Sequence, residues 1–293
     1  MEKAPSMPLA GNKYAPFTVG EGQMGSVGSA ALMPAFRLGS GLFCMGYKSE
    51  LVDDDPTQYA VARPSGKMVK ETSIVGTFPR PAQPLVIYEF ETCPFCRRVR
   101  EACSMLDLDV IFYPCPKEGP TFRPECVEKG GKSMFPYLED PNTGVAMYES
   151  ADIVDYLFEK YGGGKGTAPG GLNSGLMPFS AMLGLSARGG KGGSYDSAAA
   201  GPDRKTMKPV VFYGYEASPF VKVVRERLNE LEIPHLYKHA ARGSPKRQQI
   251  FEEYGAFQVP FIQDPNTNTA MFESTDILAY LDATYGPGAK KQE

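Results

Sequence analysis

A pair of cysteines one helical turn apart is the sequence feature with the clearest chemistry. The stretch TCPFCRR (residues 92–98) follows an apolar run and opens a segment with helical periodicity. A thiol at the start of a helix ionises readily, because unpaired amides and the helix dipole stabilise its anion, and neighbouring arginines add to the effect. Cys96 lies close enough to resolve a mixed disulfide formed on Cys93. The spacing therefore predicts a redox dithiol, with Cys93 as nucleophile and Cys96 as resolving thiol.

Two other interpretations of the cysteine pair stay open. The thiols could be inert and structural, or they could form half of a zinc or iron–sulfur site. A zinc site needs two further ligands at suitable spacing, and Cys115 and Cys126 do not form a second CxxC pattern. We therefore expect no metal. The two histidines of the chain, His235 and His239, lie far from the pair in sequence, which argues against a cysteine–histidine hydrolase.

Length and composition exclude several classes of protein. The chain has 293 residues and a net charge of −3, so it has room for two domains and lacks the basic field typical of nucleic-acid-binding proteins. No run approaches the roughly 18–20 apolar residues that a membrane-spanning helix requires. Six cysteines in a chain of ordinary core-forming composition indicate a reducing compartment rather than a disulfide framework. Among them, Cys103 falls on the apolar stripe of its helix and is expected in the core.

The chain contains one unit twice. Three pairs of segments match in order, namely 84–90 with 209–215, 93–109 with 218–234, and 135–162 with 259–286. The offset is 125 residues in the first half of the unit and 124 later, so one residue was lost in between. The second copy has Ser218 and Val221 in place of the two cysteines, and it therefore cannot exchange disulfides.

Each copy predicts the same order of elements, β-α-β-α-β-β-α. An apolar run of β-branched and aromatic residues gives a buried strand, a helix with an apolar stripe follows, and the later strands flank a hairpin turn at residues 140–144. Ser150 is expected to cap a last helix over residues 151–161, which ends at Gly162. Parallel crossovers followed by a hairpin give a mixed four-stranded sheet with helices on both faces. The predicted fold class is α/β.

This order, with CxxC at the start of the first helix, resembles the thioredoxin fold of the glutaredoxin and glutathione-transferase N-terminal type. The resemblance covers residues 83–162 and 208–287. The motifs TCPFCRRVRE, FPYLEDPNTGVAMYES and ARGSPKRQ, with a Gly-rich spacer between the copies, resemble the tandem glutathione S-transferase N-terminal-domain proteins of plant and algal plastids. The resemblance implies two thioredoxin-like domains in tandem and a location in the chloroplast.

The resemblance also implies a glutathione site around the first copy's cysteines. A cis-proline at Pro136 would turn the backbone groups of Phe135 toward a peptide-like ligand. Glu149 and Ser150 would hold the γ-glutamyl end of glutathione at the start of the last helix, and Cys93 would meet its sulfur. Glutathione is thus expected as a cosubstrate.

One departure from the family pattern concerns charge. Many glutaredoxins have a basic residue just before the motif, where this chain has Glu91. Arg97 or Lys132 is expected to bind the glycine carboxylate of glutathione in its place. A second basic run, residues 242–247, is expected to be a solvated loop and helix start, or else to dock an acidic partner.

The second copy keeps the ligand frame without the thiols. Its pocket residues are Ser218, Val259, Pro260, Glu273 and Ser274. A serine hydroxyl can donate a hydrogen bond to a bound thiolate, as serine-type glutathione transferases do. The alternative is a fold retained for packing, in which Ser218 is an ordinary N-cap; this second interpretation is favoured.

The boundaries predicted from composition are an extended arm over 1–82, the domains 83–162 and 208–287, a Gly-rich linker over 163–207 and a tail over 288–293. The arm is expected to be disordered before residue 36 and docked over 36–52. It has the few acids and small residues of an organelle-targeting segment, but a docked extension fits equally. The apolar linker stretch 172–185 is expected to be covered by packing, or to contact a membrane complex.

Three functions follow, in order of preference. The first is a glutathione-linked thiol–disulfide oxidoreductase acting through Cys93 and Cys96, with a protein disulfide as substrate. The second is a non-catalytic binding or assembly subunit of a larger complex, possible for a tandem with glycine-rich arms. The third, a conjugating or isomerising enzyme similar to glutathione transferases, is weakened because the linker is too short and too rich in glycine to form the all-helical domain of those enzymes.

Overall fold

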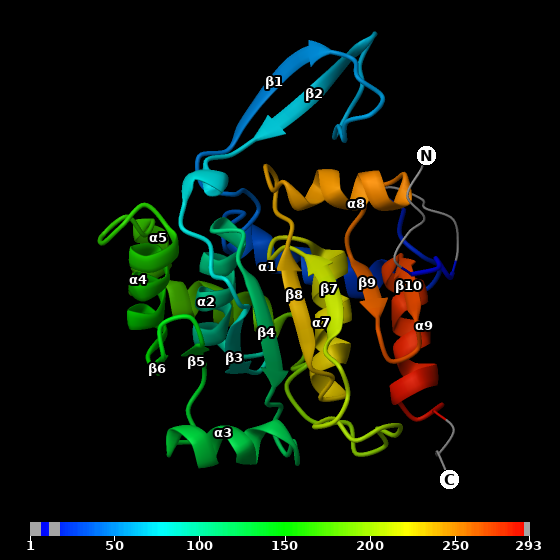
Figure 1. Cartoon of the computed structure of the whole chain (residues 1–293). Coiled ribbons are helices and arrows are strands. Elements are labelled where there is room, and N and C mark those ends of the chain that lie inside the picture. The colour runs from blue at the N-terminus through cyan, green and yellow to red at the C-terminus, as the bar shows by residue number, and fades with distance from the viewer. Residues whose placement is uncertain (1–6, 12–17, 290–293) are drawn as a thin grey trace.

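The computed structural model describes residues 7–11 and 18–289 (Figure 1). Its helices are α1 (Met24–Phe36), α2 (Pro94–Met105), α3 (Phe122–Gly130), α4 (Ser150–Tyr161), α5 (Gly170–Asn173), α6 (Met177–Ser186), α7 (Pro219–Glu230), α8 (Lys246–Tyr254) and α9 (Ser274–Tyr285), with a short 3₁₀ turn at Val75–Thr77. Its strands are β1 (Lys48–Asp53), β2 (Lys67–Thr72), β3 (Leu85–Glu89), β4 (Asp109–Pro114), β5 (Tyr137–Asp140), β6 (Val145–Met147), β7 (Val210–Gly214), β8 (His235–His239), β9 (Phe261–Asp264) and β10 (Thr269–Phe272). No helix in the described ranges is long and apolar enough to cross a membrane. Part of the disorder predicted for residues before 36, and most of the predicted tail, fall on residues 1–6, 12–17 and 290–293, which lie outside those ranges.

Each copy folds in the predicted order. The first runs β3-α2-β4-α3-β5-β6-α4 and the second β7-α7-β8-α8-β9-β10-α9. In each, the first two strands are parallel, and the last two form an antiparallel hairpin beside the first strand. The prediction of two thioredoxin-like domains is confirmed.

The two four-stranded sheets are joined into one, which the sequence did not predict. The strand order is β10-β9-β7-β8-β4-β3-β5-β6, and the junction is an antiparallel pairing of β4 with β8. Ile111 lies opposite Leu236 in this pairing, and the two residues are the same position of the two copies. An approximate two-fold axis therefore passes between them, and α3 and α8 lie at opposite ends of the molecule (Figure 1).

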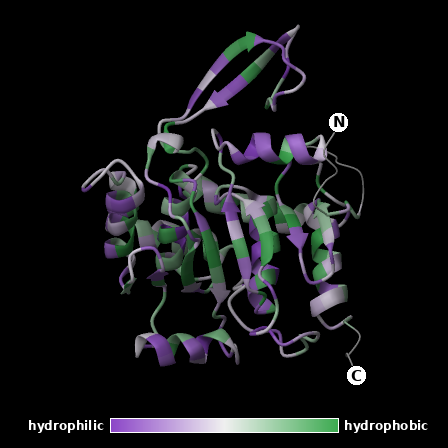
Figure 2. Cartoon of the chain, viewed as in Figure 1, coloured by the Kyte–Doolittle hydropathy of each residue, from purple (hydrophilic) through white to green (hydrophobic). Residues whose placement is uncertain are grey.

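Helices cover both faces of the continuous sheet. Side chains alternate across a strand, so Ile87 faces one core and Tyr88 the other. The core under α2, α4, α7 and α9 runs without a break through both copies and contains Cys103, as predicted. The opposite face carries two separate clusters, one under α3 and one under α8. Figure 2 shows mixed colours on the central strands, with mostly hydrophilic residues on β8 and along most of α8.

A buried network of charges joins the copies between α2 and α7, and we call it the interdomain ion network. Its members are Arg37, Glu89, Glu91, Arg97, Arg100, Glu101, Arg188, Glu216, Lys222, Arg225 and Glu226, all buried. Its central contact occurs twice. Arg97 Nη1 lies 3.0 Å from Glu216 Oε2, and Lys222 Nζ lies 2.6 Å from Glu91 Oε1. Since the repeat equates Arg97 with Lys222 and Glu91 with Glu216, the network obeys the same two-fold axis as the sheet.

The structural repeat is longer than the one visible in the sequence, because each copy is preceded by a helix and an arginine-glycine turn. Arg37 follows α1 and binds Glu101 with Nη2 and Oε2 2.7 Å apart. Arg188 follows α6 and pairs with Glu226, the counterpart of Glu101. Helix α1 packs on α7 of the second copy and α6 on α2 of the first, so each helix crosses to the other copy.

Two glycines in these turns cannot be replaced by a residue with a side chain without strain. Gly41 has a φ of 80° and Gly192 a φ of 77°, in the left-handed region that side chains disfavour. A Cβ at either position would approach the Cβ of Glu216 or of Glu91 to 2.9 Å. The turns thus lie directly against the central carboxylates of the interdomain ion network.

Two predictions about the connecting segments need correction. Residues 24–36, expected to be disordered, form α1, because Val27, Ala30 and Met33 are buried. The linker stretch 172–185 is only half covered. Its buried apolar residues are Leu172, Met177, Ala181 and Leu185, and its exposed ones are Leu176, Phe179, Met182 and Leu183.

The basic run 242–247 is also not solvated as predicted. Lys246 and Arg247 are buried. The Lys246 ammonium lies 3.1 Å from Asp107 Oδ1 and 2.9 Å from Asp109 Oδ1, both in the first copy. The run therefore forms a further contact between the copies.

The interdomain ion network leads to a prediction about stability. Replacing Glu216 by Gln leaves Arg97, Arg100 and Arg225 with one carboxylate fewer in a site closed to water. Losing one partner of a buried ion pair costs about 3–5 kcal/mol, so we expect the free energy of unfolding to fall by that amount, and by a similar amount for the counterpart variant Glu91→Gln.

The measurement is denaturation in urea. Lys129→Gln serves as control, since Lys129 pairs with Glu139 at the surface and such pairs contribute about 0–1 kcal/mol. A Glu216→Gln protein as stable as the control would show that the network does not hold the copies together.

Candidate functional site

The predicted dithiol lies where β3 ends and α2 begins. Cys93 is the N-cap of α2, in an extended conformation, and its Sγ accepts a hydrogen bond from the Cys96 amide at 3.1 Å. Pro94 occupies the first helical position, where no amide donor is needed. Both thiols are free and largely buried, with Cys93 3% exposed and Cys96 1%. The helix thus holds Cys93 where backbone amides converge.

The two thiols of the pair differ in acidity. Burial would raise the pKa of Cys93, but hydrogen bonds from the Cys96 thiol and amide outweigh it and leave the pKa of Cys93 below its ordinary value. Burial and the hydrogen bond to Cys93 raise the pKa of Cys96 well above its ordinary value. Of the pair, Cys93 is therefore the thiol that ionises first.

The remaining cysteines are in less reactive surroundings. Cys44 and Cys103 are buried, and burial raises the pKa of each. Burial likewise raises the pKa of Cys115 far above its ordinary value and that of Cys126 to about 11. Among the residues described, no group of three or more histidine, cysteine or acidic side chains is arranged to hold a metal ion.

The loop before β5 faces the nucleophile. The Phe135–Pro136 peptide bond is cis, and the Phe135 carbonyl oxygen lies 3.8 Å from Cys93 Sγ. The Phe135 ring packs edge-on against Phe90, and the guanidinium of Arg123 lies over it at 4.7 Å from the ring centroid. The structure therefore brings Phe135 and Pro136 to the dithiol.

Glu149 and Ser150 lie at the start of α4, but the capping prediction for Ser150 is wrong. The N-cap position is occupied by Glu149, and Ser150 is the first helical residue. Glu149 has a φ of 67° and a ψ of 105°, a conformation that is costly for a residue with a side chain. Glu273 has the same conformation in the second copy, with a φ of 70°. Such strain persists where the surrounding structure imposes it, and it is common at ligand sites.

The structure does not bring Arg97 to the predicted glutathione site. Arg97 is fully buried, and its guanidinium is bound to Glu101 and Glu216, so it points into the interdomain ion network and not toward a ligand. Arg98, next along the helix, donates from Nη1 to Ser150 Oγ at 3.4 Å.

Arg98 is a buried cation with a hydrogen-bond donor that no described residue accepts. It is 7% exposed, its Nε has no hydrogen-bond partner among the described residues, and burial lowers its pKa. The signal that could have identified it is the repeat, because the second copy, without thiols, has Val223 at this position. Arg98, Ser150 and the first amides of α4 together form a place where a carboxylate could bind.

The second copy keeps the backbone arrangement of the site, but the chain covers the start of its last helix. Ser218 is the N-cap of α7 and accepts from the Val221 amide at 3.3 Å, and the Val259–Pro260 bond is cis. Ser274 donates to Gln23 Oε1 at 3.2 Å. The chain segment before α1 therefore occupies the position where the family would place the γ-glutamyl carboxylate.

The chain was compared with known proteins. The family model of the glutathione S-transferase N-terminal domain matches it twice, over residues 87–165 and 212–289. A solved glutathione transferase of Bombyx mori is 28% identical over 29% of this chain and 39% of its own, with a TM-score of 0.26. A trimeric glutathione transferase of Leishmania is 15% identical over 72% of this chain and 68% of its own, with a TM-score of 0.25. No curated protein matched the sequence.

The two structural similarities are too weak to support an argument, and this chain spans about two fifths of the Bombyx mori protein. The family match is different, because together its two regions cover more than half of the chain and coincide with the two folded copies. The chain therefore belongs to the family of proteins that carry the glutathione S-transferase N-terminal domain, and it contains that domain twice.

Proposed function

We propose that the protein is a glutathione-linked thiol–disulfide oxidoreductase that acts through Cys93 and Cys96. The observation that carries this proposal is the opposite displacement of the two thiol pKa values. The lowered pKa of Cys93 favours its thiolate, and the raised pKa of Cys96 favours its protonated form. A pair of inert core thiols would have both pKa values raised by burial, as Cys44 and Cys103 do.

The reaction follows from thiol chemistry. The Cys93 thiolate attacks one sulfur of a protein disulfide, the sulfur–sulfur bond breaks, and the departing thiolate takes a proton. Cys96 then loses its proton and attacks Cys93, which releases the reduced substrate and leaves a Cys93–Cys96 disulfide. Two glutathione thiols reduce that disulfide in two exchanges and leave as glutathione disulfide. Electrons balance, since one disulfide is reduced and one is formed.

In this proposal glutathione binds to backbone groups and charged side chains of the first copy. Its cysteinyl backbone would pair with Phe135, whose carbonyl lies beside Cys93. Its γ-glutamyl carboxylate would accept hydrogen bonds from Ser150, Arg98 and the start of α4, and the exposed Glu149 would face the ammonium group. This assignment replaces Arg97 by Arg98 as the cation of the site.

The rim of the site suits a protein substrate. Cys93 itself is nearly buried, but Phe95 is 47% exposed and Met134 is 42% exposed. These two apolar side chains come from the two segments that meet at the thiol. An unfolded or loop segment carrying a disulfide would cover them on binding.

The proposal is tested with purified protein, a small disulfide and reduced glutathione, coupled to glutathione reductase. We expect turnover in the wild type and only the uncatalysed rate for Cys93→Ser. Cys96→Ser should accumulate a mixed disulfide, seen as a mass increase of one glutathione. Cys126→Ser is the control and should retain activity, because that thiol is buried and its pKa is raised to about 11. Wild-type protein without turnover would reject the proposal.

The acidity of Cys93 gives a second prediction. Its rate of alkylation by iodoacetamide should reach half of its maximum below pH 8.5, roughly the ordinary thiol pKa. Cys96→Ala removes a hydrogen bond that stabilises the thiolate, so the pKa of Cys93 should rise in that variant. The measurement is alkylation rate against pH, with the modified peptide identified by mass. An unchanged profile in Cys96→Ala would contradict the assigned cause.

The role of Arg98 gives a third prediction. Arg98→Val installs the residue of the second copy and removes one charge-assisted hydrogen bond to the glutathione carboxylate. We expect the KM for glutathione to rise about 10–100-fold. The alkylation profile of Cys93 should stay unchanged, because Arg98 is not among its hydrogen-bond partners. A variant with the wild-type KM would remove Arg98 from the site.

A second candidate function is a binding or assembly subunit, and one observation favours it. Helices α1 and α6 pack on each other and contain no charged residue. Their exposed apolar side chains are Met24, Leu32, Phe36, Phe179, Met182 and Leu183, with Leu38 and Leu176 beside them. Such a surface suits contact with a protein or membrane complex. A plastid location remains part of this proposal, and imaging of a fluorescent fusion would test it.

A further inference from the structure

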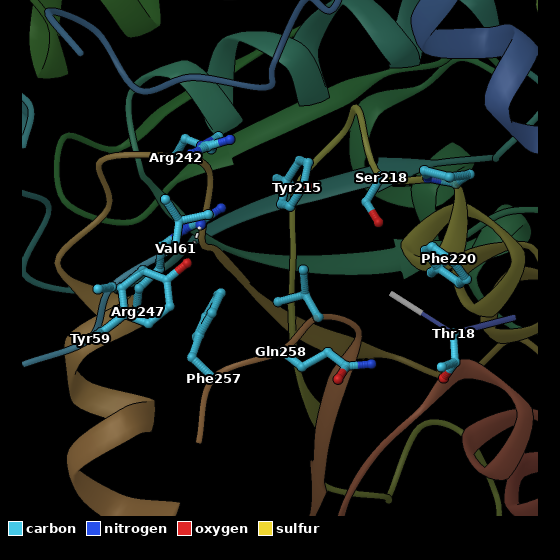
Figure 3. A pocket seen from close by; sticks show the side chains of 13 residues that line it. Thr18, Tyr59, Val61, Tyr215, Ser218, Phe220, Arg242, Arg247, Phe257 and Gln258 are labelled. Atoms are coloured by element: carbon cyan, nitrogen blue, oxygen red, sulfur yellow. Dashed lines mark hydrogen bonds between the residues drawn. The ribbon is translucent and has the colours of Figure 1, made fainter. Parts of the chain in front are cut away.

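A cavity of about 230 Å³ lies between the second copy and the N-terminal arm. Its walls are Thr18, Tyr59, Ala60 and Val61 from the arm, and Tyr215, Ser218, Pro219, Phe220, Arg242, Arg247, Phe257, Gln258 and Val259 from the second copy. Figure 3 shows Arg242 and Arg247 at one end of this space and Ser218 and Phe220 at the other. We call it the arm pocket. Neither piece of chain forms it alone.

The arm pocket has more positive than negative charge. Arg242 and Arg247 share a single carboxylate, that of Glu71 on β2, whose side chain is only 2% exposed. Glu71 also accepts from the Tyr47 hydroxyl. Two guanidinium groups therefore share one carboxylate at the wall of a partly apolar cavity, where an anion is attracted more strongly than in water. A second carboxylate, that of Glu273, accepts from Nε2 of the wall residue Gln258 at 2.9 Å.

The two guanidinium groups still have donors to offer. Arg247 is 5% exposed; its Nε donates to the carbonyls of Ala240 and Ala241, and its Nη1 to Tyr59 and Glu71, but Nη2 makes no hydrogen bond with any described residue. Arg242 uses only Nε, toward Glu71. An incoming carboxylate or phosphate can thus be bound without breaking an existing contact.

Aromatic and aliphatic groups form the rest of the cavity. The Arg247 guanidinium lies 4.9 Å from the Phe257 ring centroid and 5.7 Å from those of Tyr59 and Tyr215, so the charge is framed by rings. Oε1 of Gln258 is buried and has no hydrogen-bond partner among the described residues. Rings, a buried acceptor and a pair of guanidiniums suit a small molecule with an apolar body and an acidic end.

The arm pocket occupies the place in the second copy that the surroundings of Cys93 occupy in the first, because Ser218 and Val259 are the counterparts of Cys93 and Phe135, but its walls are different. At the positions of Arg242, Phe257 and Gln258 the first copy has Lys117, Ser133 and Met134. The second copy therefore carries an extra ring and a guanidinium where the first has small or flexible side chains. The end that would hold a γ-glutamyl group is closed, because Gln23 is bound to Ser274 and Gly20 leaves no room beside Thr275.

We propose that the arm pocket is a binding site for a small organic anion, a carboxylate or phosphate ester with an aromatic or aliphatic body, held by Arg242 and Arg247. The site is separate from the dithiol and does not depend on its function. Residues 59–61 of the arm complete its wall.

The proposal is tested by isothermal titration calorimetry on the full chain. The probes are 4-phenylbutyrate, phenyl phosphate, the neutral 4-phenylbutanol, and reduced glutathione. We expect dissociation constants below about 1 mM for one or both anions and at least tenfold weaker binding of the alcohol. The stronger of the two anions shows whether the natural ligand carries a carboxylate or a phosphate. Cys93→Ser should bind them as the wild type does.

Variants locate the binding. Arg242→Gln should weaken the anions about tenfold or more and leave the alcohol unchanged. Lys117→Gln, the matched position in the first copy, should change nothing. Phe257→Ser installs the first copy's residue, removes a wall, and should weaken acid and alcohol alike. Because the chain has no tryptophan, Phe220→Trp places a single indole in the pocket, and its emission should saturate at the calorimetric constant.

Three outcomes would overturn the proposal. One is the failure of both anions to bind, and another is equal affinity for acid and alcohol. The third is glutathione displacing the anions, which would make the cavity a glutathione site after all. Since Arg242 is 30% exposed and Arg247 is buried, Arg242→Gln is the variant expected to fold, and its unfolding midpoint in urea verifies this.

Discussion

The interdomain ion network is the constraint on which the rest of the structure depends. Charges removed from water are tolerated only if each finds a partner, and here the partners come from both copies and from the turns after α1 and α6. Neither copy can therefore leave the other without exposing or stranding charge. The continuous sheet and the shared core follow the same axis, so polar and apolar contacts specify one arrangement.

This constraint also shapes the surroundings of the dithiol. Helix α2 has Cys93 as its N-cap and carries the network along its next turns, so Arg97 and Arg100 serve the interface. The thiolate of Cys93 is left to rely chiefly on the Cys96 amide and thiol, with Arg100 as a smaller contribution. Glu89 works against it, since its carboxylate raises the pKa of Cys93. The second copy, which has no thiol to tune, has Gly214 at that position.

The sequence predicted what depends on local periodicity and on the repeat. Element order and the core position of Cys103 follow from patterns within one copy, and the place of the two prolines facing the helix starts was implied by the family resemblance. It failed where the answer depends on which surface meets which. Arg97 and Arg98 are adjacent and of one type, yet a rotation of about 100° along the helix sends one into the interface and the other toward Ser150. The pairing of β4 with β8 was hidden for the same reason, because an edge strand looks alike whether it meets water or another strand.

The arm makes the surroundings of the two copies different. The framework is symmetric, but the segments that cover it are not. Gln23 accepts a hydrogen bond from Ser274 at the start of α9. Residues 59–61 form part of the wall of the arm pocket. In the first copy Ser150 faces Arg98 instead, and the rim at Phe95 stays exposed. The copies also diverge within the network, where Gly214 and Lys222 are the counterparts of Glu89 and Arg97. A thiol in place of Ser218 would lie in a cavity that the chain's own arm partly closes, so the thiols are found in the copy whose equivalent site lacks that wall.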